Sequence, residues 1–148
     1  AAGASRCCAV LCRGDEHFVA DVAHPWAMHL YRDYDDPEPQ DLGGVEAALS
    51  LFAAAAGAGD EPEAKRPRRS PAEQPHLLHV IGSPADLDSV RLPLDTLVRA
   101  RAKLVRSLPT CLTLLHPECS KADGLLPVLS ELGVLPSRAL ALGDAEND

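Results

Sequence analysis

The sequence predicts an α/β protein, because apolar runs of strand length alternate with longer segments of helical spacing. The clearest succession lies near the C-terminal end, where residues 111–115 form an apolar run, residues 120–133 have helical spacing, and residues 139–142 form a second apolar run. A helix that leads into a buried strand is half of a parallel α/β layer. Carboxylates follow directly, in residues 144–148. Open α/β sheets bind ligands at this position, beyond the carboxyl ends of their strands.

The N-terminal part is predicted to contain two short strands joined by a polar turn, then a short helix and an alanine-rich segment. The short helix is predicted because large side chains recur every four residues, at Trp26, Leu30 and Tyr34. The alanine-rich segment is compatible with a weak helix, or with a strand plus a helix. In chain order these elements are expected at residues 7–12, 17–22, 23–34 and 45–56.

Residues 57–75 differ sharply in composition from what precedes them. They are rich in Gly, Pro and Glu and contain a basic cluster at residues 65–69. Such a segment has too little apolar surface to offset the entropy of ordering, so it is predicted to be a disordered insertion. The basic cluster, Lys65 to Arg69, is either a solvated linker or a nuclear localisation signal.

A strand, a helix and a second strand are predicted after the insertion. Residues 77–82 read as a strand, and Pro84 suits the first turn of a helix because it has no N–H to donate. Apolar residues at spacings of three and four predict that this helix continues to about Ser107. Residues 111–115 read as the next strand.

The helix predicted over residues 120–133 has clear start and stop signals. Ser120 is a good N-cap, and Asp123 lies in the first turn, where the helix dipole favours negative charge. Gly133 is placed to end the helix. Its apolar residues are expected to form a buried stripe, consisting of Leu125, Leu126, Val128, Leu129 and Leu132.

The overall composition limits the possible classes of protein. A length of 148 residues allows one domain, with room for an inserted piece. The net charge of −8 argues against a general nucleic-acid binder, and no apolar run approaches the roughly 20 residues of a membrane span. The five cysteines are odd in number and lack zinc-ligand spacing, so we expect reduced thiols and a reducing intracellular compartment.

The last residues supply candidate metal ligands. Asp144 and Asp148 follow the apolar run at residues 139–142, with Asn147 between them. Carboxylate oxygens suit Mg²⁺, which proteins usually hold through one or two carboxylates plus substrate phosphate. A polar turn at a chain end is the alternative interpretation.

The pair Ser120-Lys121, followed by Leu-Ala-Leu-Gly-Asp-Ala-Glu-Asn-Asp at residues 140–148, resembles the haloacid dehalogenase (HAD) superfamily, and within it the Cof-type (class IIB) phosphatases. The resemblance implies a HAD-like Rossmannoid core with an inserted α+β cap. Residues 111–148 would be the C-terminal part of that core, truncated. Residues 1–110 would be the cap region, interrupted by the insertion at 57–75.

The resemblance also implies roles for individual residues. Asp144 would bind Mg²⁺, and Asp148 would bind it directly or through water. Asn147 would orient the phosphate or its loop. Lys121 would neutralise the attacking carboxylate and the transferring phosphoryl group. The activity implied is that of a Mg²⁺-dependent phosphatase, which hydrolyses a small phosphorylated metabolite through an aspartyl-phosphate.

One part of the family pattern is missing from this sequence. The superfamily's nucleophilic aspartate lies in an N-terminal DxDxT motif, and no such motif follows a buried strand here. The chain is therefore expected to be a fragment without its nucleophile, inactive by itself. The alternatives are a degenerate, non-enzymatic HAD-like module acting in protein interaction, and a nuclear-targeted regulator. The sequence leaves open the substrate, the oligomeric state and the compartment, whether cytoplasm, plastid or nucleus.

Overall fold

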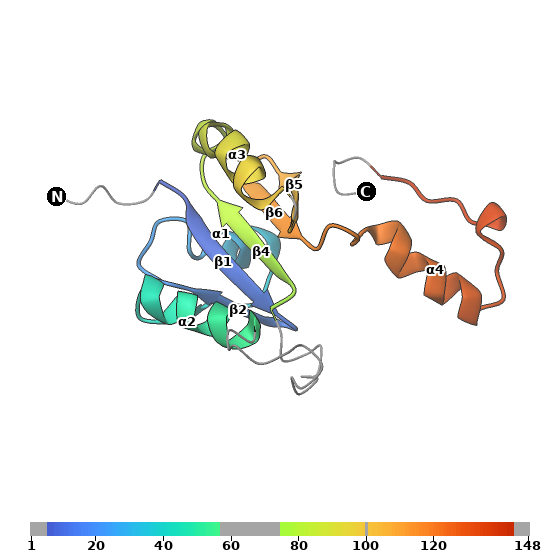
Figure 1. The fold of residues 1–148 in the computed structure, drawn as a ribbon, viewed down its shortest axis with the longest axis horizontal. Coiled ribbons are helices and arrows are strands. Elements are labelled where there is room, and N and C mark those ends of the chain that lie inside the picture. Colours follow the sequence, from blue (N-terminus) through green and yellow to red (C-terminus); the bar gives the residue numbers. More distant parts are fainter. Residues whose placement is uncertain (1–5, 57–74, 100, 144–148) are drawn as a thin grey trace.

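A computed structural model describes residues 6–56, 75–99 and 101–143, without the side chains of 51–56, and its centre is a six-stranded sheet (Figure 1). The strand order is β3-β2-β1-β4-β6-β5, and every pair is antiparallel except β2 with β3. The strands are β1 (Cys8–Arg13), β2 (Glu16–Val19), β3 (Gln40–Asp41), β4 (Leu77–Ile81), β5 (Lys103–Leu108) and β6 (Cys111–Leu115), and the helices are α1 (His29–Tyr34), α2 (Val45–Ala56), α3 (Pro84–Val98), α4 (Lys121–Glu131) and the short 3-10 helix η3 (Pro136–Arg138).

Two hairpins and one long-range pairing build the sheet. The β1–β2 hairpin turns at Gly14, whose φ of 55° is a left-handed conformation that glycine adopts without a steric penalty. The β5–β6 hairpin turns at Pro109 and Thr110. Strand β4 lies between these hairpins and pairs with both β1 and β6, so it joins the two halves of the sheet.

One face of the sheet packs under α1 and the turn before it. Val10, Cys12 and Ile81 are almost completely buried there, against Ala27 and Leu30. His29 of α1 also reaches the β5–β6 turn, with its Nε2 atom 2.8 Å from Thr110 Oγ1. This hydrogen bond ties the helix to the far end of the sheet.

The other face packs against α3. Leu87 is fully buried with Val80, Leu104 and Leu112 of three neighbouring strands. Because long apolar side chains on both sides of β4 and β6 are excluded from water, these central strands carry the core of the protein.

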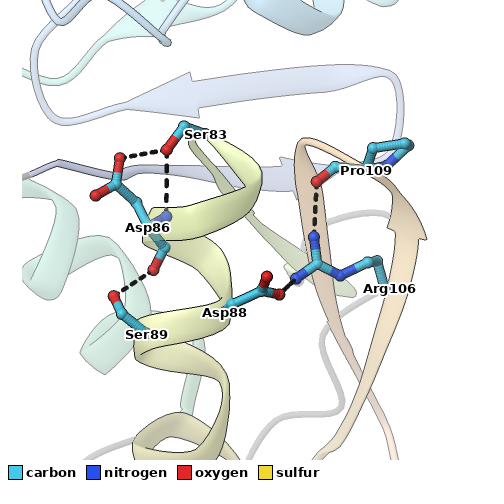
Figure 2. A network of polar contacts seen from close by, with 6 residues as sticks. All are labelled: Ser83, Asp86, Asp88, Ser89, Arg106 and Pro109. Carbon is cyan, nitrogen blue, oxygen red and sulfur yellow. Dashed lines mark hydrogen bonds and ion pairs between the residues drawn. The ribbon is translucent and has the colours of Figure 1, made fainter.

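Polar contacts fix the start of α3 and its position beside β5 (Figure 2). The Ser83 hydroxyl accepts a hydrogen bond from the Asp86 amide at 3.2 Å, which satisfies a free donor of the first turn. Two residues further along, Asp88 forms an ion pair with Arg106 of β5. Arg106 also donates to the carbonyl oxygen of Pro109 at 2.7 Å. The helix is thereby connected to the hairpin that it covers.

The mixed α/β class predicted from the sequence is confirmed, and the strands around residues 77–82 and 111–115 form as expected. The sheet includes β6, which the sequence analysis had grouped with the C-terminal region. Helix α1 begins at His29 rather than near residue 23, and turns precede it.

The prediction that the helix after Pro84 continues to Ser107 is wrong. Helix α3 ends at Val98, and Lys103–Leu108 forms the edge strand β5. Val105 fits a helical spacing, but in the structure it pairs with Thr113 of β6 and its side chain is buried. The hydrogen bonds and burial gained on pairing outweigh the local helical pattern.

The local signals of α4 are confirmed, whereas its predicted burial is wrong. Ser120 caps the helix by accepting from the Asp123 amide at 3.0 Å, and Gly133 follows the last turn with a φ of 65°. No residue of α4 is buried, and Leu126 is 48% exposed. Figure 1 shows the helix lying to the side of the sheet, and Leu125, Val128 and Leu132 are exposed as well.

The strand predicted at residues 139–142 does not form, which also removes the expected parallel layer. Leu140 and Leu142 are 86% and 90% exposed. A strand needs a neighbouring strand to satisfy its backbone groups, and none of the described strands lies beside this segment. The insertion predicted at 57–75 lies outside the described residues except for Pro75. Among the helices that the structure describes, none combines the length and apolar character of a membrane span.

Candidate functional site

A cavity of about 300 Å³ lies on the face of the sheet formed by β4, β5 and β6. Its walls are mainly apolar, and they come from Leu77, Val105 and Leu115. Residues 119–121, at the start of α4, also line it. The cavity is therefore formed by the sheet together with the segment that contains the Ser120-Lys121 pair.

Hydrogen-bonding side chains form the inner part of this cavity. His79 of β4 lies opposite Thr113 of β6, with 2.9 Å between His79 Nδ1 and Thr113 Oγ1. The Thr113 hydroxyl is also 2.8 Å from the Ser107 hydroxyl of β5. Cys111 Sγ lies 3.3 Å from the same His79 nitrogen. Three adjacent strands thus contribute to one polar cluster.

Burial keeps His79 uncharged at neutral pH. Loss of solvation, reinforced by the nearby His17, lowers the pKa of His79 to about 4. The two imidazole rings meet edge to face, with 6.5 Å between their centroids. Burial likewise raises the pKa of the Cys111 thiol, so that this group remains protonated. The polar cluster therefore offers hydrogen bonds without a formal charge.

Positive charge lies at the other end of the cavity. Lys121 is the first residue of α4, and Lys103 is exposed on the edge strand β5. The cap geometry of Ser120 fixes where the helix begins, and so fixes the position of the Lys121 backbone beside the cavity. An α4 N-terminus and two lysines give this end an attraction for anions.

Of the residues predicted from the sequence to form a site, Lys121 is brought to this cavity. Asp144, Asn147 and Asp148 lie outside the described residues, so their proximity to Lys121 stays a prediction. Within the described ranges, no group of three His, Cys, Asp or Glu side chains is arranged to hold a metal ion.

The polar cluster of His79, Thr113 and Ser107 was not predicted from the sequence. The available signal was the alternation along β4 and β6, which places a polar residue between apolar ones on the same face. Because β5 was taken for helix, Ser107 was not expected to meet the other two residues. No disulfide joins any of the five cysteines, all of which lie within the described residues.

A scan against protein families matches residues 58–148 to the haloacid dehalogenase-like hydrolases. Among curated proteins, an HMP-PP phosphatase from Citrobacter koseri is 33% identical over 81 residues. That alignment covers 55% of this chain and 30% of the relative. The aligned part of the chain thus corresponds to under a third of the length of this relative.

Solved structures show the same fold. A haloacid dehalogenase-like hydrolase from Bacteroides thetaiotaomicron superposes with a TM-score of 0.61 at 14% identity, and a protein from Thermotoga maritima with 0.63 at 17%. Each match covers 95% of this chain and 44% of the other protein. Because the family match extends over more than half of its residues, the chain belongs to the haloacid dehalogenase-like hydrolases.

Proposed function

We propose that the protein containing this chain is a Mg²⁺-dependent phosphatase that hydrolyses a small phosphorylated metabolite. The observation that carries this proposal is the position of Lys121, at the capped start of α4 and on the wall of the cavity. Family membership and the name of the Citrobacter koseri relative, a phosphatase, support the same reaction.

Lys121 supplies positive charge where the transferring group carries negative charge. Phosphoryl transfer depends mainly on positioning and on electrostatic stabilisation of charge spread over the phosphoryl oxygens. An ammonium group at a helix N-terminus adds to the field of the helix dipole, so both favour an anion at the same place. The neighbouring Ser120 holds this first turn in position by capping it.

Asp144 and Asp148 are the residues proposed to hold Mg²⁺. Two carboxylates form a donor set of hard oxygen atoms, which fits this ion. Bound there, the metal would help to neutralise the phosphate oxygens. Asn147, between the two aspartates, would orient the phosphate or the loop by hydrogen bonding.

The proposed nucleophile is an aspartate outside this chain, since the sequence contains no DxDxT motif after a buried strand. Its carboxylate would attack phosphorus, the P–O bond to the substrate would break, and the alcohol would leave. Water would then hydrolyse the aspartyl-phosphate to release inorganic phosphate and regenerate the carboxylate.

The test is phosphate release by the complete protein that includes this sequence, with small phosphate esters as substrates. We expect turnover with Mg²⁺ and none after chelation. Lys121→Ala should lower kcat by about a hundredfold or more, the scale for removing a group that stabilises developing charge. Asp144→Asn should lower Mg²⁺ affinity as well. Arg138→Ala, which removes an exposed cation from the same segment, is the matched control and should retain activity.

Two results would count against this function. Turnover that is unaffected by Lys121→Ala would remove the role given to that residue. If no phosphate ester is hydrolysed by the folded, Mg²⁺-loaded protein, the non-enzymatic interaction module becomes the better account.

A further inference from the structure

The strand register shows which cavity residues lie near its charged end and which lie near its neutral end. Lys103 pairs with Leu115, and Val105 pairs with Thr113, one side-chain row further in. Successive rows on one face are two residues apart, or about 7 Å. The outer row, with Lys103 and Leu115, lies at the end of β6 from which the chain runs on to Lys121. A ligand held by the lysines would therefore extend inward toward the row of Thr113.

One hydrogen-bonding atom of the inner row makes no hydrogen bond within the described protein. His79 Nδ1 is engaged by Thr113 and Cys111, whereas Nε2 has no hydrogen-bond partner among the described residues. The Thr113 hydroxyl is itself engaged by Ser107. His79 lines the cavity, so a ligand atom placed there could form a hydrogen bond with this nitrogen.

The remaining wall of the cavity disfavours charge. Leu77, Val105 and Leu115 line it, and Val105 is only 3% exposed. A second phosphate or a carboxylate placed here would lose its hydration without a cation in the inner row. A hexose would bring several hydroxyl groups to this wall, whose three apolar side chains offer no hydrogen bond.

We propose that this cavity binds the leaving group of the substrate, and that this group is compact, uncharged and mainly apolar, with one hydrogen-bonding atom that meets His79 Nε2. A volume of about 300 Å³ accommodates a single substituted ring. The inference rests on the proposed phosphatase function, because it assigns the phosphate to Lys121 and the leaving group to the sheet. His79 would be a specificity-determining residue of that reaction.

The kinetic test compares benzyl phosphate with pyridylmethyl phosphate in the complete protein. These esters have nearly the same shape and differ in one ring nitrogen. We expect kcat/KM to be about three- to tenfold higher for the pyridyl ester, the usual scale of one hydrogen bond. His79→Phe should abolish this difference, so that kcat/KM becomes equal for the two esters. His76→Gln changes an exposed histidine that does not line the cavity, and should keep the difference.

Thr113→Val is a second, gentler variant, which removes one hydroxyl at almost constant volume. It should reduce the preference for the pyridyl ester, because it releases His79 from its fixed orientation. The inference is overturned if the preference persists in both variants. It is also overturned if a hexose phosphate or a bisphosphate is turned over faster than both aromatic esters.

A measurement of ligand binding to this chain alone tests the inference independently of the proposed reaction. Pyridinemethanol, titrated into the isotope-labelled chain, should shift the imidazole nitrogen resonances of His79, and benzyl alcohol should shift them much less. A shift without any phosphatase activity in the complete protein would support the cavity and contradict the phosphatase. Phosphatase activity without a shift and without ester preference would support the reaction and contradict the inference.

Discussion

The sheet and helix α4 are built with the same local signals but differ completely in burial. Ser83 and Ser120 cap their helices in the same way, each accepting from the amide three residues later and donating to that aspartate's carboxylate. Leu112 in the sheet is fully buried, whereas Leu126 on α4 is 48% exposed. Four adjacent residues are therefore enough to specify where a helix starts, whereas burial of that helix requires a second apolar surface.

The largest expected difference between the two regions concerns apolar truncation. Leu112→Ala should lower the free energy of unfolding by about 3 kcal/mol, because it leaves a cavity among side chains that cannot relax fully. Leu126→Ala should change it by less than about 0.5 kcal/mol, since its side chain is already half in water. Urea unfolding monitored by circular dichroism measures both values. Equal losses would show that α4 is packed in solution.

A change in pH is expected to have a smaller effect on the free energy of unfolding. This effect comes from His79 in the sheet and not from α4. An unfolded histidine has a pKa near 6.5, whereas burial lowers the pKa of His79 in the fold to about 4. Between these values the unfolded chain binds more protons, so stability is full above about pH 6.5 and falls as the pH drops toward 4. The contribution lost from about pH 7 to pH 5 is roughly 2 kcal/mol.

Urea unfolding of His79→Gln at both pH values measures the contribution of His79 to this pH dependence. On acidification the variant should lose about 2 kcal/mol less of its free energy of unfolding than the natural chain. His76→Gln serves as the control, because His76 is exposed. Identical acid sensitivity of the natural chain and His79→Gln would contradict the assignment of a neutral buried histidine.

The smallest effect compares the two caps. Ser83→Ala should lower the stability of the whole sheet by about 1 kcal/mol, because α3 is packed on it through Leu87. Ser120→Ala should instead lower the helix content of α4 and leave the unfolding of the sheet unchanged. Hydrogen exchange of individual amides distinguishes a global effect from a local one. Loss of protection in β4 after Ser120→Ala would show that the two regions are coupled.

The sequence predicted those elements whose signals are local. The helix start at Pro84, the cap at Ser120, the glycine after α4 and the apolar runs of β4 and β6 were all recognisable from a few adjacent residues. Strand β5 was missed because its spacing also fits a helix, and the pairing with β6 decides between the two. Burial of α4 was predicted from its apolar stripe, but a stripe shows only which face could be buried.

The candidate site was predictable in part for the same reason. Lys121 was recognised from a motif in the sequence, and the structure brings it to the cavity. The contacts of His79 depend on Thr113, which is 34 residues away, and on Ser107 of the strand that was missed. No pattern along the chain predicts these contacts, because they follow from the order of the strands across the sheet.

The pairing of β4 with β1 has a consequence for a chain cut between α2 and β4. Five residue pairs join Cys8–Arg13 to Leu77–Ile81, and both strands have a second neighbour in the sheet. The two pieces would therefore share one hydrophobic core rather than hold one each. A protease that cleaves there should leave a nicked protein that elutes as one species and separates only in denaturant. Separately expressed halves should complement each other when mixed.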